Sequence, residues 1–192
     1  MNPSRGFSLL ELLTVVAILL VAAAVAAPYL KAYSVQAQVL SAGKVFQGEF
    51  LRARSAAIRG NVNTAIRFEP KADGSYNFSI YADGNNNGVL AADIRSGVDR
   101  RLAGPFSLTG GAPGVRVGIL PDIPEIPPER GMLDPRDPIR FGRSNMVSFS
   151  PEGTATPGTF YLAGECFQAA VRVNAMTSRV RLLVYNGRWV ER

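Results

Sequence analysis

The spacing of hydrophobic residues divides the chain into successive parts. From Phe7 to Ala27 nearly every residue is apolar, and Glu11 is the single charge. At about 1.5 Å per residue, this run forms a helix of roughly 31 Å, long enough to cross the hydrocarbon core of a membrane. No second long apolar run follows it in the sequence. We therefore expect one membrane-spanning helix, at the start of the chain.

A helical period continues after the apolar run. Pro28 should kink the helix without ending it. Beyond it, apolar residues recur every three or four positions, as on one face of an amphipathic helix. These positions are Val35, Val39, Ala42, Phe46, Phe50, Ala53 and Ala57. The pattern predicts a single helix from Phe7 to Arg59, roughly 80 Å long, with Gly60-Asn61 as a pair suited to a left-handed cap.

After Asn61 the hydrophobic period changes from 3.6 to 2, which is typical of half-buried β-strands. Turn residues such as Asp73-Gly74 and Asn186-Gly187 separate the alternating segments. The predicted strands lie at 65–68, 76–81, 115–120, 146–150, 159–162, 169–173, 179–185 and 188–190. The fold class that follows is α+β, with an antiparallel sheet packed against the amphipathic half of the long helix.

These patterns predict four divisions of the chain. They are a leader at 1–6, the transmembrane half of the helix at 7–27, its amphipathic half at 28–60, and a β-rich head at 61–192. Within the head, the proline-rich stretch 120–138 is predicted to be an extended surface loop. It suits either a partner contact or an insertion.

The amino-acid composition favours some classes of function and excludes others. The formal net charge of +6 suits anionic partners such as nucleic acid or a membrane surface. The chain has no histidine, which removes histidine-based catalysis and the commonest metal ligand. Cys166, the single cysteine, cannot form an internal disulfide, and we expect a small buried residue in a strand. Since no nucleophile elbow, phosphate loop or paired catalytic acids stand out, an enzyme is not predicted.

Two ordinary interpretations of the N-terminal run compete with a third. In a secretory signal peptide, Arg5 is the positive end, and Ala24, Ala26 and Ala27 suit cleavage. The run is long for that class and holds a carboxylate near its start. In a plain membrane anchor, the carboxylate of Glu11 costs about 2.5–3.5 kcal/mol unless it reaches the interface.

The third interpretation connects Gly6, Phe7 and Glu11. If the leader is cut after Gly6, Phe7 becomes the new N-terminus, one helical turn before Glu11. Its amine can then pair with Glu11 of the same chain or of a neighbouring chain. Such pairing makes a carboxylate tolerable in apolar surroundings.

Gly6, Phe7 and the run FSLLELL, with Glu11 at its fifth position, resemble the class III signal of type IV pilins and type II secretion pseudopilins. The resemblance implies cleavage by prepilin peptidase on the cytoplasmic side and N-methylation of Phe7. It also implies an inner-membrane assembly platform and a helical filament made with other pilins or pseudopilins. The protein would cross the bacterial inner membrane once, with its head in the periplasm or, in the filament, outside the cell. Arg5 before the span agrees with a cytoplasmic leader.

The rest of the chain is similar to the GspH/FimT group of minor pilins. The similarity rests on the helix end at 51–59, the strand at 66–68, the loop at 83–93 and the turn at 149–154. It implies a long helix under a β-sandwich-like head, in a structural subunit of a type II secretion pseudopilus or a type IV pilus. The proline-rich stretch departs from the group's pattern.

Some FimT-type members bind DNA during uptake through arginines of a Gly-Arg-x-Arg motif. The corresponding stretch is Ser178-Arg179-Val180-Arg181, in which both arginines match but serine replaces glycine. Strand alternation puts Arg179 and Arg181 on one face, where they can contact phosphates. The alternative is a solvated strand face whose charges oppose aggregation.

The loop at 83–93 resembles half of a calcium loop. Asp83, Asn85 and Asn87, followed by a glycine, match the first half of an EF-hand-type loop, but Asp93 falls one position early and no glutamate closes it. A weak calcium site at these four residues is the one cofactor expectation. The alternative is an Asn/Gly-rich turn whose side chains cap its own backbone.

Overall fold

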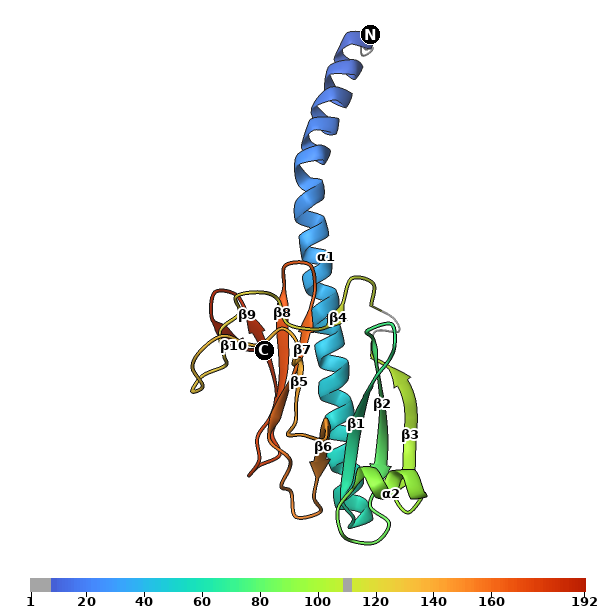
Figure 1. The fold of residues 1–192 in the computed structure, drawn as a ribbon. Helices are drawn as coiled ribbons and strands as arrows, with labels where there is room; N and C mark the ends of the chain where they lie inside the picture. The colour runs from blue at the N-terminus through green and yellow to red at the C-terminus, as the bar shows by residue number, and fades with distance from the viewer. Residues whose placement is uncertain (1–7, 109–111) are drawn as a thin grey trace. The chain divides into compact units, whose positions relative to one another are not determined.

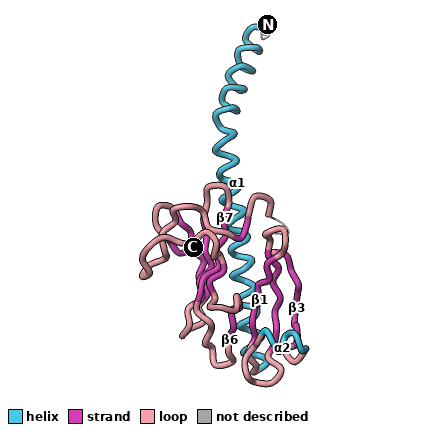
Figure 2. Tube along the Cα trace, viewed as in Figure 1, coloured by secondary structure: helices cyan, strands magenta, loops and turns pink. Residues whose placement is uncertain are grey.

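The computed structural model describes residues 8–108 and 112–192. The chain divides into two compact units, Met1–Ser34 and Val35–Arg192. Helix α1 (Leu9–Gly60) contributes residues to both units and continues through Pro28, as predicted. Figure 1 shows the elements with their labels, and Figure 2 distinguishes helices, strands and loops.

The described part of the first unit is helical almost throughout, and its side chains are all exposed. An 18-residue stretch of α1 is strongly apolar, and none of it is buried. Leucine, valine and isoleucine side chains therefore lie uncovered along this part of the helix. The length and composition are those of a helix that can cross a membrane.

The second unit begins with the amphipathic part of α1. Its buried residues are Val35, Val39, Gly43, Phe46, Phe50, Ala53 and Ala57. The predicted stripe is confirmed except at one position, because Gly43 is buried and Ala42 is half-buried. A Cβ atom at Gly43 would lie 2.6 Å from Cδ1 of Leu182, so the glycine permits a close approach between helix and sheet.

The end of α1 has the predicted cap. Asn61 follows the last helical residue with φ 49°, in the left-handed region. The N–H of Val62 donates to the carbonyl oxygen of Ala57 at 3.3 Å. This is the hydrogen bond of a Schellman motif, with Asn61 in the position that glycine usually takes.

Two antiparallel sheets follow α1 in the second unit. The first has the order β3 (Arg100–Ser107), β2 (Tyr76–Ala82), β1 (Thr64–Pro70) and β6 (Met146–Phe149). The second has the order β10 (Trp189–Glu191), β9 (Val180–Tyr185), β8 (Gln168–Val173), β7 (Gly158–Ala163) and β4 (Arg116–Val117), and β5 (Ile139–Arg140) also pairs with β7. A short helix, α2 (Ala91–Ser96), lies between β2 and β3. The α+β class is confirmed.

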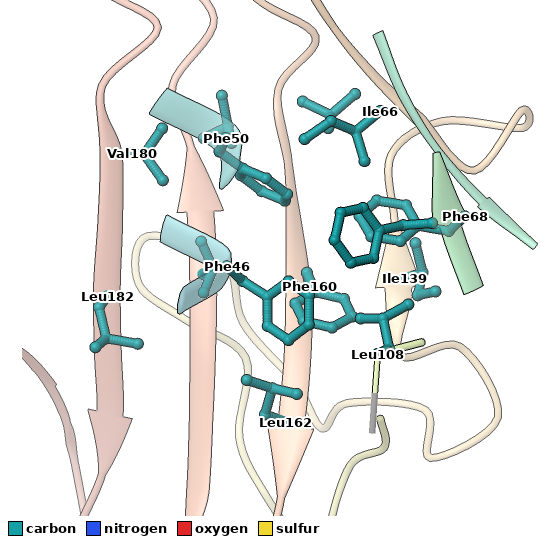
Figure 3. Close-up of a cluster of buried hydrophobic side chains, with 14 of the residues drawn as sticks. Phe46, Phe50, Ile66, Phe68, Leu108, Ile139, Phe160, Leu162, Val180 and Leu182 are labelled. Carbon is teal, nitrogen blue, oxygen red and sulfur yellow. The ribbon is translucent and has the colours of Figure 1, made fainter. Parts of the chain in front are cut away.

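The core joins α1 to both sheets through aromatic rings (Figure 3). Phe46 of α1 lies 5.7 Å from Phe78 of the first sheet and 5.0 Å from Phe160 of the second, between ring centroids, both in edge-on geometry. Phe68 stacks on Phe160 across the sheets at 5.4 Å. Such pairs contribute about 0.5–1.5 kcal/mol each beyond their buried area. One helix face therefore holds both sheets.

The sequence pattern did not predict three elements, namely α2, β3 and β5. In β3 the alternation is interrupted, because Gly104 has φ 98° and is followed by Pro105. A Cβ atom at Gly104 would lie 2.8 Å from the carbonyl oxygen of Phe78, so only glycine fits there. The pairing of β2 with β3 shifts register around Ile80. An edge strand tolerates proline, and β3 is an edge strand. The predicted strand at 115–120 shortens to β4.

The prediction of an extended surface loop at 120–138 was wrong in part. Ile123, Ile126 and Leu133 are buried, and they form a second apolar cluster with Tyr161 and Leu183 of the second sheet. These strand residues alternate with the ones that face α1. The proline-rich loop therefore covers the face of the second sheet opposite α1, and an uncovered apolar sheet face is the physical reason.

The expectation for Cys166 was also wrong, since its side chain is exposed. Strand β7 ends at Ala163, and the N–H of Gly164 donates to the carbonyl oxygen of Phe167 at 2.8 Å. Cys166 therefore lies in the tight turn between β7 and β8, outside the strands.

Candidate functional sites

Glu11 lies in the first turn of α1. Its backbone N–H donates to Oγ of Ser8, the residue before the helix, at 3.2 Å. Ser8 and Glu11 thus have the spacing of a capping box, and a carboxylate in the first turn also interacts favourably with the helix dipole. This S-x-x-E signal was present in the sequence and was not used. Gly6 and Phe7 lie outside the described residues.

The polar side chains of this apolar segment are satisfied locally. The hydroxyl of Thr14 donates to the carbonyl oxygen of Glu11 at 2.8 Å, and that of Ser34 to Lys31 at 2.8 Å. Hydroxyls bonded within a helix can enter apolar surroundings at low cost. The carboxylate of Glu11, in contrast, accepts no hydrogen bond from a described residue.

The candidate calcium residues lie together in one loop. Asp83 is buried and accepts hydrogen bonds from Asn63 Nδ2 at 3.1 Å, from Asn85 N at 3.1 Å and from Gly88 N at 2.7 Å. Burial by itself raises the pKa of the Asp83 carboxyl, but these hydrogen bonds outweigh it and hold the pKa below the ordinary value. The carboxylate is therefore ionised and already occupied by donors.

Asp93, the second candidate acid of the loop, also accepts hydrogen bonds from the loop itself. The side-chain amides of Asn85 and Asn87 donate to Asp93 Oδ2 at 3.2 and 2.9 Å. Across residues 8–108 and 112–192, no group of three or more His, Cys, Asp or Glu is placed to hold a metal ion. The geometry favours the alternative of a self-capped turn, and calcium binding stays a prediction.

Asp99 holds the same loop by hydrogen bonds, and it was not identified from the sequence. It is buried, with Oδ1 accepting from Gly84 N at 3.0 Å and Oδ2 from Leu90 N at 2.9 Å. One carboxylate thus joins two points of the loop to the start of β3. No spacing pattern distinguishes Asp99 from other aspartates, so only the folded loop identifies it.

The candidate DNA-binding arginines share one partner. Arg179 Nη2 lies 2.9 Å from Oε1 of Glu191, and Arg181 Nη1 lies 3.6 Å from Oε2 of the same carboxylate. The two side chains therefore lie on one face, as alternation predicts. Ser178 has φ 44°, so this serine adopts the left-handed conformation that a glycine would adopt more easily. The serine at this position therefore has a backbone conformation that is open to glycine.

Strand register extends this cationic surface. Arg140 of β5 is opposite Thr159 of β7, Thr159 is opposite Arg172 of β8, and Arg172 is opposite Arg181 of β9. Cross-strand partners share a face, so three arginines form one row on the second sheet. We call Arg140, Arg172 and Arg181 the arginine row. Which strands are neighbours cannot be read from local patterns, so the sequence did not reveal it.

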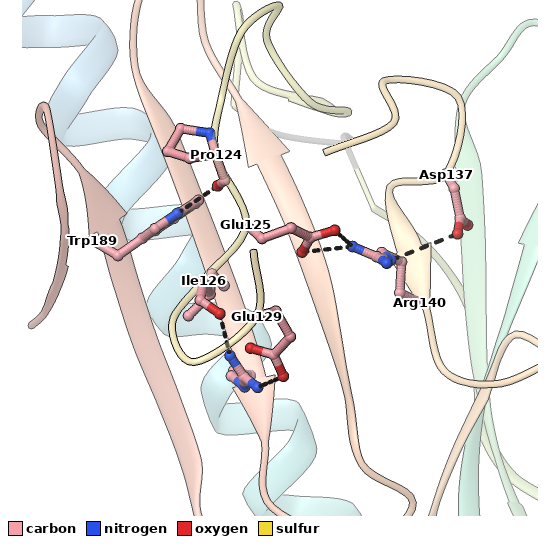
Figure 4. Close-up of polar contacts among 8 residues, drawn as sticks. Pro124, Glu125, Ile126, Glu129, Asp137, Arg140 and Trp189 are labelled. Atoms are coloured by element: carbon pink, nitrogen blue, oxygen red, sulfur yellow. Dashed lines mark hydrogen bonds and ion pairs between the residues drawn. The ribbon is translucent and has the colours of Figure 1, made fainter. Parts of the chain in front are cut away.

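Acids of the proline-rich loop pair with the arginine row (Figure 4). Arg140 Nη1 lies 2.7 and 2.9 Å from the two carboxylate oxygens of Glu125, and Arg172 Nη2 lies 2.6 Å from Glu129 Oε1. The Arg172 hydrogen bond is the main cause that lowers the pKa of Glu129. A cavity of about 480 Å³ lies between this loop and the row. The surface is cationic, but its charges are largely compensated within the chain.

Comparison with known proteins adds a finding at the other end of the chain. Residues 1–27 match the family model described as the prokaryotic N-terminal methylation motif. No curated protein and no solved structure gave a match. The motif implies processing by prepilin peptidase and assembly with other pilins. With the exposed apolar helix, it fits a membrane-anchored pilin. The methylation motif therefore supports a type IV pilin-like protein that prepilin peptidase processes.

Proposed function

We propose that this chain is a minor pilin or pseudopilin, a structural subunit of a type II secretion pseudopilus or a type IV pilus. The observation that carries the proposal is the exposed apolar part of α1, which begins at Leu9 within the methylation motif at residues 1–27. Exposure of such an apolar surface to water is energetically unfavourable. In this proposal the inner membrane covers it before assembly and neighbouring helices cover it in the filament.

Glu11 has a specific place in this proposal. A carboxylate within the apolar layer is costly unless a partner compensates it. The N–H of Glu11 is occupied by Ser8, whereas its carboxylate has no partner among the described residues. We assign that carboxylate to the N-terminal amine of a processed neighbouring chain, in line with cleavage after Gly6 and methylation of Phe7.

The remaining parts of the proposal follow from a pilin-like subunit. Assembly on an inner-membrane platform would leave the two-sheet head in the periplasm or, in the filament, outside the cell. The role is structural rather than enzymatic, since the motif is that of an assembled subunit.

The test combines processing with assembly. Full-length chains carrying Gly6→Trp or Glu11→Ala are expressed with prepilin peptidase and the remaining filament subunits. We expect Gly6→Trp to remain unprocessed, and Glu11→Ala to be processed but to enter filaments poorly. Thr14→Ala is the matched control, because its hydroxyl only bonds within the helix. Normal processing of the Gly6→Trp chain would contradict the whole proposal, and normal assembly of Glu11→Ala would contradict the pairing alone.

A second candidate function is DNA binding by the head during uptake. It is supported by the left-handed turn at Ser178 and by the position of Arg179 and Arg181 on one face. Arg179 has a side chain that is 67% exposed, so a phosphate can reach it. Against it stands Glu191, which already pairs with both arginines.

This candidate is tested with the full chain in detergent and a short DNA duplex at low salt. Arg179→Ala/Arg181→Ala should weaken binding and reduce the dependence of the dissociation constant on salt, because fewer counterions are released. Arg101→Ala, on the first sheet, is the control. Unchanged affinity and salt dependence in the double variant would rule out these arginines as the DNA contact.

A further inference from the structure

A cavity of about 610 Å³ lies between the last turns of α1 and the first sheet. Arg59 and Gly60 of α1 line it together with Thr64 of β1, Ala82 of β2 and Arg100 of β3. All of these residues belong to the second unit. The cavity is separate from the arginine row, which lies on the second sheet.

One residue that lines the cavity, Thr64, has a buried hydroxyl. Thr64 is 0% exposed, and its Oγ1 has no hydrogen-bond partner among the described residues. Thr64 is opposite Ala82, and Ala82 is opposite Arg100, so the three side chains form one row on a single face. Thr64 shares this face with Ile66, which lies in the core against α1. A buried polar group without a partner is costly, and a bound ligand is one way to satisfy it.

Two arginines, Arg59 and Arg100, also line the cavity. Both are exposed, and neither guanidinium group forms an ion pair or hydrogen bond with a described residue. The arginine row differs, since Glu125, Glu129 and Glu191 engage its members. Between the polar groups the walls are apolar, formed by the side chains Ala56, Val62, Ala82 and Leu102.

Negative groups near the cavity limit what it can bind. Asp83 lines it, but its oxygens already accept three hydrogen bonds. The carbonyl end of α1 is negative too, although the Val62 hydrogen bond satisfies one carbonyl. A doubly charged phosphate would be repelled more strongly by these groups than a singly charged anion. Guanidinium groups suit a carboxylate, and the apolar walls suit a hydrocarbon stem.

We propose that this cavity binds a carboxylate carried on a short apolar stem. Arg59 and Arg100 hold the carboxylate, the hydroxyl of Thr64 donates to it, and the stem lies against Leu102 and Val62. The C-terminus of a polypeptide that ends in an apolar residue has this chemistry, and so has a free aliphatic acid.

The test uses the full chain in lipid nanodiscs and calorimetric titration, with empty nanodiscs subtracted. The probes are hexanoate against hexanamide, and acetyl-Gly-Gly-Leu with a free carboxylate against its C-terminal amide. At least one acid should bind ten times more tightly than its amide, and the pair that does so identifies the source of the carboxylate. Equal binding by acid and amide in both pairs, or no binding at all, overturns the proposal.

Two variants localise the binding. Arg100→Gln should weaken the acid about tenfold, whereas Arg101→Gln should not, because Arg101 is opposite Tyr81 on the other face of the sheet. An Arg100→Gln chain with native affinity overturns the site. Thr64→Val keeps the volume and removes the hydroxyl, so it should raise the melting temperature while weakening the acid severalfold. A purely structural threonine would change stability and leave the affinity unaltered, which would remove Thr64 from the site.

Discussion

The indole N–H of Trp189 donates a hydrogen bond to the carbonyl oxygen of Pro124 at 2.9 Å. It joins the last strand, β10, to the proline-rich loop, and both are visible in Figure 4. The ring of Trp189 also lies 6.2 Å from that of Tyr161, between centroids, beside the second apolar cluster. One residue near the C-terminus thus helps to hold the loop on the sheet.

We predict that Trp189→Phe lowers the free energy of unfolding by about 1–2 kcal/mol, because the Pro124 carbonyl loses its donor while an aromatic ring is kept. Denaturant unfolding of the full chain in detergent, followed by near-ultraviolet circular dichroism, measures it. Val190→Ala, at a more exposed position of the same strand, should have a much smaller effect. Equal effects of the two variants would show that the hydrogen bond contributes nothing.

Acid should weaken the attachment of the same loop. The Arg172 hydrogen bond lowers the pKa of Glu129 from its ordinary value near 4.5. A carboxyl with a lowered folded-state pKa stabilises the protein above the ordinary value, and this contribution is lost as the pH falls through the lower folded-state value. We expect the melting temperature to fall below pH 4.5, and Glu129→Gln to remove part of that fall.

The effect of Glu129→Gln at neutral pH should be small, about 2 °C or less, since Glu129 is half exposed. The chain has a single tryptophan, so fluorescence reports directly on Trp189 and the loop beside it. Asp134→Asn is the control, because Asp134 pairs with Arg136 and both side chains are exposed. A pH dependence that is identical in Glu129→Gln and the native chain would contradict the assignment.

Ser178 offers a stabilising substitution. Its φ of 44° is strained for a residue with a Cβ atom, and its buried Oγ has no hydrogen-bond partner in the part of the chain that the structure describes. Ser178→Gly removes both costs, so we expect the free energy of unfolding to rise by about 1 kcal/mol. Asn145→Gly is the matched control, with φ 50°, and should gain less because asparagine tolerates this region. Thermal unfolding compares the two.

The sequence was sufficient wherever structure follows local periodicity or a linear motif. The stripe of α1 was visible because helical burial repeats every three or four residues, and the leader motif because Gly6, Phe7 and Glu11 lie close together in the chain. The arginine row and the Thr64–Ala82–Arg100 row were not visible, because each joins strands that only tertiary pairing brings together. Strand β3 was missed because Gly104-Pro105 interrupts its alternation.

The proline-rich loop shows a different limit. Its prolines indicated a loop correctly, but Ile123 and Ile126 between them are buried against the second sheet. Whether an apolar residue in a loop is buried depends on which uncovered surface lies nearby, and that surface is formed by strands later in the chain. Composition therefore predicted that the segment is a loop, but it did not predict that the loop packs on the second sheet.

Gly43 tests how closely α1 approaches the second sheet. A Cβ atom there would lie 2.6 Å from Cδ1 of Leu182, whereas one at Gly48 would have no neighbour within 4 Å. Gly43→Ala should lower the free energy of unfolding by about 1–3 kcal/mol through overpacking. Gly48→Ala, in the same helix, should raise it by about 0.5–1 kcal/mol through helix propensity. Adding Leu182→Val to Gly43→Ala should recover part of the loss, because it shortens the side chain that clashes. Denaturant unfolding of the four chains decides the point, and stabilisation by Gly43→Ala would show that helix and sheet are farther apart than described.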